Sequence, residues 1–225
     1  MIRNIKKQWL IIAVTAVLVV VAVMLYTSSR MSQLLNRPYE LKDFPQVQGT
    51  AEYQIVVDGL NKSREKILSK PEDQVVLYDL WNDVGVRKLA LNDYYGAEAA
   101  WKKAESINSK NPLAIANRAN LYKAFLHRFY ESEKLYLQAI ALNKTAEPYF
   151  PDYEGLADLY QNYWQDKKSK VESLMLSAID KAFDPLNKAR FYLFLANYMR
   201  STDPAKFEMY RAETIKYDPS LSSQF

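Results

Sequence analysis

Apolar residues recur at nearly constant intervals from Trp81 to the end of this chain. One series of anchors, spaced 35, 37 and 39 residues apart, consists of Trp81, Ala116, Tyr153 and Tyr192. A second series, spaced 35, 39 and 34 residues apart, consists of Ala104, Ala139, Ala178 and Ala212. Internal repetition with such a period is typical of stacked helical units, because each unit buries its apolar face against the next. The spacing therefore predicts a helical repeat array.

The repeated unit is clearest between Trp81 and Pro112, in the stretch WNDVGVRKLALNDYYGAEAAWKKAESINSKNP. It joins W-x2-V-G to A-x3-W-x2-A through a turn-like LNDYYG, and a proline follows. This pattern predicts a hairpin of two helices, over 72–90 and 93–108. The spacing resembles that of the tetratricopeptide repeat (TPR), W-x2-L-G-x2-Y, A-x3-F and a closing proline. The resemblance extends over three further units and implies an all-α, TPR-like hairpin solenoid of about four repeats over residues 71–225.

Small residues are expected where the two helices of each hairpin touch, because they let the backbones approach closely. The positions that this alignment assigns to such contacts are Gly85, Ala97, Ala104, Ala139, Ala157, Ala196 and Ala212. In the fourth unit, the residues expected on the packing face of the second helix are Ala205, Met209, Ala212 and Ile215.

Three helices are expected to begin at a proline, because proline is tolerated in the first helical turn. These prolines are Pro151, Pro185 and Pro204. Asp184 and Asp203 each precede one of them and are expected to act as N-caps.

An apolar segment precedes the repeats. Residues 10–25 carry no charge and are flanked by Trp9 and Tyr26, which suit the two membrane interfaces. At ~1.5 Å per residue, 9–26 would span roughly 27 Å, enough for a single transmembrane helix. The following TSSRMSQ matches a cleavage site poorly, so an uncleaved signal anchor is preferred to a signal peptide. The basic flank 1–8 predicts a cytoplasmic N-terminus and an extracytoplasmic repeat domain, in the periplasm or at the cell surface.

Two further segments lie between the anchor and the repeats. Residues 27–50 lack a sustained period and contain Pro38, Pro45 and Gly49, which predicts a linker. Residues 51–70 are expected to form a helix that covers the first hairpin, with a packing face of Tyr53, Val56, Leu60 and Ile67. Ser69 and Glu72 are expected to form a capping box for the next helix.

Composition excludes several kinds of chemistry. Cysteine is absent and His127 is the only histidine, so thiolate sites and histidine-based metal sites are not expected. The five glycines are scattered and form no phosphate-binding loop. The net charge of +4 arises mostly from the basic N-terminal flank, which leaves a nearly neutral body without the basic face that nucleic acids require. We therefore expect no catalytic residues, no cofactor and no nucleic-acid partner.

In TPR proteins the first helices of the hairpins line a concave groove. The resemblance implies a protein-binding groove lined by Asn82, Val86, Asn117, Leu121, Glu154, Asp158, Gln161, Asn197 and Arg200. Family members that bind a chaperone's C-terminal carboxylate use lysine, asparagine and arginine at set groove positions. The corresponding positions here hold Asn82, Val86, Pro151 and Gly155, so that activity is not implied.

An anchor joined to repeats without catalytic residues predicts a membrane-anchored, non-enzymatic scaffold of a bacterial cell envelope, whose groove binds a protein or an extended peptide. Two alternatives remain open at this point. The chain could be a structural subunit of an envelope or secretion complex that acts through its convex face or membrane helix. It could also be an accessory binder of glycan or lipid.

Overall fold

The structure, a computed structural model, describes residues 37–47, 49–143 and 147–225, and every regular element within these ranges is a helix. The basic flank 1–8, the predicted transmembrane helix 9–26 and part of the linker lie outside these ranges. In the described part of the chain, no helix combines the length and the apolar character needed to cross a bilayer. The chain divides into two compact units, Met1–Asn108 and Ser109–Phe225.

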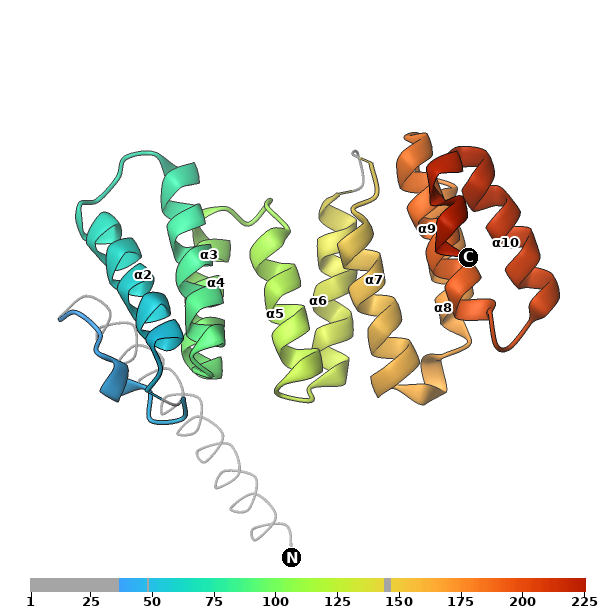
Figure 1. Cartoon of the computed structure of the whole chain (residues 1–225). Coiled ribbons are helices and arrows are strands. Elements are labelled where there is room, and N and C mark those ends of the chain that lie inside the picture. The colour runs from blue at the N-terminus through green and yellow to red at the C-terminus, as the bar shows by residue number, and fades with distance from the viewer. Residues whose placement is uncertain (1–36, 48, 144–146) are drawn as a thin grey trace, which may run out of the picture. The chain divides into compact units, whose positions relative to one another are not determined.

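Unit 1 contains the covering helix and the first hairpin. Helix α2 (Ala51–Leu68) packs against α3 (Gln74–Ala90), and α3 packs against α4 (Tyr94–Ile107), as Figure 1 shows. The two helices of the hairpin agree with the predicted 72–90 and 93–108. The apolar side chains that form the core between these helices include Val57, Leu60, Ile67, Trp81, Val84 and Trp101.

The hairpin contact depends on Gly85. A Cβ atom at this position would lie 2.6 Å from Cδ1 of Trp101, far inside van der Waals contact. The indole of Trp101 also donates a hydrogen bond from Nε1 to the carbonyl oxygen of Asn82, at 3.2 Å. The predicted close approach of the two helices is confirmed here, because only a residue without a side chain leaves room for this indole.

Part of the predicted linker belongs to the folded body. Tyr39 and Phe44 are buried, and the backbone of Tyr39 exchanges two hydrogen bonds with the Asn61 side chain of α2, at 2.7 and 2.9 Å. Gln46 donates from Nε2 to the carbonyl oxygen of Leu91, at 2.7 Å, in the turn between α3 and α4. Residues 37–47, which include the short 3₁₀ helix η1 (Leu41–Asp43), are therefore bound to α2 and to the turn between α3 and α4 within unit 1.

The expected capping box at Ser69 and Glu72 is wrong. The cap of α3 is Asp73, whose carboxylate accepts from the backbone N–H of Val75 at 2.7 Å. The hydroxyl of Ser69 instead donates to the carbonyl oxygen of Lys66 at the end of α2, at 2.7 Å. An aspartate one residue before the first helical turn is in the position to cap it, and Ser69 is too far upstream.

In the described residues of unit 2, 109–143 and 147–225, six α-helices follow one another along the chain. They are α5 (Leu113–Ala124), α6 (Phe129–Leu142), α7 (Phe150–Asp158), α8 (Lys170–Ile179), α9 (Pro185–Met199) and α10 (Pro204–Tyr217). A π-helix, η2 (Leu159–Tyr163), continues α7 and is followed by the 3₁₀ helix η3 (Gln165–Lys167); a last 3₁₀ helix, η4 (Pro219–Gln224), follows α10. Helix α5 packs against α6, α7 against α8, and α9 against α10, so the hairpin arrangement is confirmed within this unit.

The predicted helix starts in unit 2 are confirmed. Pro151, Pro185 and Pro204 each lie in a first helical turn. Asp184 accepts from the backbone N–H of Leu186 at 3.0 Å, and Asp203 accepts from that of Lys206 at 3.1 Å.

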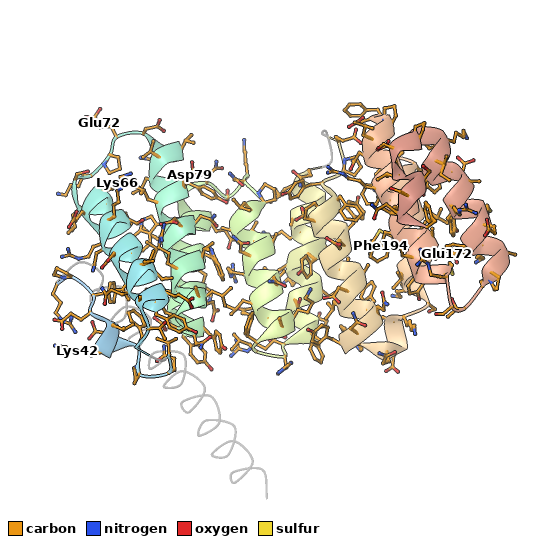
Figure 2. All side chains as sticks on the ribbon, viewed as in Figure 1. Lys42, Lys66, Glu72, Asp79, Glu172 and Phe194 are labelled. Carbon is orange, nitrogen blue, oxygen red and sulfur yellow. The ribbon has the colours of Figure 1, made fainter. Side chains whose placement is uncertain are left out.

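Successive hairpins of unit 2 are joined through glutamates at equivalent positions of α6 and α8. Glu133 accepts hydrogen bonds from Tyr160 and Lys167, both at 2.5 Å. Glu172, which is 39 residues later, accepts from Tyr210 at 2.5 Å and from Lys206 at 2.7 Å (Figure 2). The hydrogen bond from Lys206 and then that from Tyr210 hold the pKa of Glu172 below its ordinary value. Each glutamate thus links the second helix of one hairpin to elements of the next.

The expected register of α10 is wrong. Ala205, Met209 and Ala212 are exposed, whereas Tyr210 and Thr214 are buried. Tyr210 is held by Glu172, and the ring of Tyr217 stacks on Tyr192 with centroids 5.8 Å apart. Because Tyr210, Thr214 and Tyr217 recur at helical spacing, they form the packing face in place of the alanines.

Candidate functional site

Two adjoining hollows open on one face of unit 2, between the first helices of its hairpins. The first, of about 530 Å³, lies along α7 and α9; the second, of about 640 Å³, lies along α5 and α7. We call the first the aromatic hollow and the second the polar hollow. Glu154, Gln161 and Phe194 line both, so the two form one continuous depression. Volumes of about 300–1,000 Å³ are typical of ligand-binding clefts.

The aromatic hollow combines rings with unpaired polar groups. Its lining residues are Phe150, Glu154, Gln161, Arg190, Leu193, Phe194, Asn197 and Tyr198. The rings of Phe150 and Phe194 meet edge to face at 6.4 Å, and Tyr198 stacks on Phe194 at 6.5 Å. Figure 2 places Phe194 between α7 and α9. Glu154 and Arg190 are exposed, and neither has an ion-pair partner among the described residues.

The polar hollow contains an ion pair that joins α5 to α7. The ammonium of Lys123 lies 2.5 Å from Oδ2 of Asp158, and Asn162 donates to Oδ1 of the same carboxylate at 2.6 Å. Lys123 is buried, and its ammonium also lies 5.8 Å from the centre of the Tyr136 ring. This carboxylate is therefore bound within the chain, which leaves Glu154 as the unpaired exposed acid of the two hollows.

Gly155 and Asp152 are two of the α7 residues that line the polar hollow. A Cβ atom on Gly155 would lie 2.6 Å from Cζ of Tyr136, so a larger residue would push this ring out of place. Asp152 is 2 % exposed, and the one hydrogen bond of its carboxylate among the described residues comes from Asn143 at 3.2 Å. Burial raises the pKa of Asp152 from 3.8 to about 6, because a charged carboxylate is poorly solvated there, and the Asn143 bond offsets this only in part.

We expect Asp152→Asn to stabilise the protein at neutral pH. The pKa of this carboxyl is 3.8 in the unfolded chain and about 6 in the folded protein. The stability that the neutral acid contributes is therefore fully present below pH 3.8 and is lost as the pH rises through about 6. The amide cannot ionise, so at pH 7.5 the variant should have a free energy of unfolding about 2 kcal/mol above that of wild type, and nearly equal to it at pH 4. Urea unfolding of the full chain at both pH values measures this. The matched control is Asp180→Asn on the exposed end of α8, which should change stability little at either pH; an equal effect of Asp152→Asn at both pH values would contradict the expectation.

The structure brings together five of the nine groove residues that the sequence predicts. Those that line the hollows are Asn117, Glu154, Asp158, Gln161 and Asn197. The prediction that Leu121 lines the groove is wrong. This residue is fully buried because it faces the helical core from α5, so it contributes no groove surface. Arg200 lines neither hollow, since its guanidinium lies over the Phe207 ring at 5.5 Å. Asn82 and Val86 belong to unit 1, where Val86 is 48 % exposed.

The sequence interpretation missed the aromatic part of the site. Phe194 and Arg190 precede the predicted Asn197 by three and seven residues, so all three share one helical face. Extending that face along α9 would have found them. Phe150 was harder to find, because it precedes a proline in a segment without clear periodicity.

No protein-family model, curated protein or solved structure matches the chain. Among the described residues, no three His, Asp or Glu side chains are grouped so that they could hold a metal ion. His127 is exposed, with a φ of 52°, in the turn between α5 and α6, and it lines neither hollow.

Proposed function

We propose that this chain is a membrane-anchored, TPR-like, non-enzymatic scaffold whose unit 2 binds an extended segment of another protein. The observation that carries the proposal is the continuous depression formed by the two hollows, which runs across the first helices α5, α7 and α9. It is open along its length, as an extended chain requires, and is not a closed cavity for a small molecule.

The lining chemistry supports a peptide ligand. Aromatic rings such as Phe150 and Phe194 supply apolar anchor sites, which contribute most of the binding energy in protein interfaces. Asn120, Gln161 and Asn197 carry amides that can both donate and accept, so they can pair with the N–H and C=O groups of an extended backbone. The depression thus offers both apolar and hydrogen-bonding contacts.

The proposed location follows from the N-terminal sequence. The charge-free segment 10–25, with interfacial aromatics and a basic flank, supports a single-pass anchor with a cytoplasmic N-terminus. We propose that the repeats lie in the periplasm or at the cell surface of a bacterium, where they bring a partner protein to the membrane.

Site-specific photo-crosslinking of the full chain in its membrane tests the proposal. A photoreactive residue at Asn197, in the aromatic hollow, should crosslink another polypeptide, and adding Phe194→Asp should abolish the product. The matched position is Leu137 on α6, which is exposed and lines neither hollow. Crosslinks from Leu137 but not from Asn197 would overturn the groove and favour a structural subunit that acts through its other face.

A further inference from the structure

The distribution of charge along the depression is uneven. Among the described residues, three carboxylates line the polar hollow, those of Asp152, Glu154 and Asp158, and one ammonium, that of Lys123. Because Lys123 is bound to Asp158, the other two carboxylates have no cation facing them there among the described residues. Only Glu154 of these two is exposed, so it is the group on which an incoming cation would pair.

Among the described residues that line the aromatic hollow, negative and positive charges balance. Its charged groups are Glu154, at the boundary with the polar hollow, and Arg190. Like-charge repulsion disfavours a ligand cation next to Arg190, whereas the rings of Phe150 and Phe194 favour an apolar side chain. Glu154 and Phe194 line both hollows, so the two hollows meet at these side chains. A ligand that places a cationic group in the polar hollow and an apolar group in the aromatic hollow therefore carries the two groups on neighbouring residues.

We propose that the bound segment carries a lysine or arginine beside a large apolar residue. Its cationic group pairs with Glu154 over the polar hollow, and its apolar side chain enters the aromatic hollow against Phe194. This inference rests on the proposed function and adds the chemistry of the ligand to it. The ring of Tyr149, which is exposed and also lines the polar hollow, favours a cation by its negative face.

Selection of peptides on the full chain tests this inference. A display library of random octapeptides is selected on the detergent-purified protein, with protein-free beads as the blank. Peptides with Lys or Arg within two positions of Phe, Trp, Leu or Met should be enriched over the blank. Replacing that cation with glutamate in a synthetic copy should weaken binding about tenfold, as measured by fluorescence anisotropy.

Variants of the chain decide between the outcomes. Glu154→Lys should invert the preference, so that the glutamate copy binds more tightly, whereas Glu131→Lys on the exposed face of α6 should leave it unchanged. The inference would be overturned if the selected peptides require Phe194 but show no preference for a cation. It would also be overturned if that preference survives Glu154→Lys. In both cases the peptide groove would stand. Selection of no peptides above the blank would overturn both.

Discussion

Replacing Gly85 with leucine is expected to lower the free energy of unfolding by about 3 kcal/mol, because it overpacks the contact between α3 and α4. The first added atom, Cβ, would already lie 2.6 Å from Cδ1 of Trp101, and the rest of the leucine adds further volume to this contact. The indole would have to leave its place and give up its hydrogen bond to Asn82. Urea unfolding of the full chain, followed by far-ultraviolet circular dichroism, measures the change.

Two further variants show whether the cause is steric. Gly49→Leu, where the nearest atom to an added Cβ is 3.8 Å away, should change stability by less than about 0.5 kcal/mol. In Gly85→Leu/Trp101→Ala, the leucine can occupy space that the indole leaves, so the double variant should lose less than the sum of the two single losses. Strict additivity would contradict the steric explanation.

Replacing Lys88 with methionine is expected to cost about 3–5 kcal/mol, since it removes the Lys88 ammonium from beside the buried carboxylate of Asp93. Lys88 and Asp93 form an ion pair of 2.8 Å whose side chains are only 6 % and 4 % exposed. Asp93 also caps α4 by accepting from the N–H of Gly96 at 3.0 Å, and the Lys88 ammonium lies 4.8 Å from the centre of the Tyr39 ring. The variant should therefore lose both the turn of the first hairpin and the docking of residues 37–47.

The same unfolding measurement, with two comparisons, tests this explanation. Lys88→Met/Asp93→Asn removes both charges and keeps a capping oxygen, so it should recover more than half of the loss. Lys216→Met, which breaks an exposed pair with Glu213, should change the free energy of unfolding little. If the double variant is as unstable as Lys88→Met alone, the loss of the Lys88 charge beside Asp93 is not the cause of the lower stability.

Features with local causes could be predicted from the sequence. Pro185 and Pro204 mark helix starts because a proline ring suits the first turn, and Asp184 and Asp203 cap those helices because a carboxylate reaches the free N–H groups next to it. Gly85 marks a close contact because its neighbours repeat at helical spacing. In each case the decisive partner lies a few residues away or in the adjacent helix.

Features that depend on distant partners were mispredicted or missed. The face of α10 follows Tyr210, which is bound to Glu172 from 38 residues earlier, and the alanine spacing contained no sign of this bond. Leu121 faces the core although its repeat position suggested the groove. Residues 37–47 are held by Asn61 and Leu91, partners that no local pattern names.

The sequence by itself therefore determined the all-α class, the hairpins and most helix starts of this protein, because periodicity and capping act over one or two helical turns. Only the tertiary structure decided which side chains share the depression. It pairs Lys123 with Asp158 across two helices, leaves Glu154 exposed and unpaired, and adds Phe150 and Phe194 from helices about forty residues apart. The physical reason is that ion pairing and burial depend on which helices pack together. A residue of the same type can therefore lie in the core at one position and line a binding site at another.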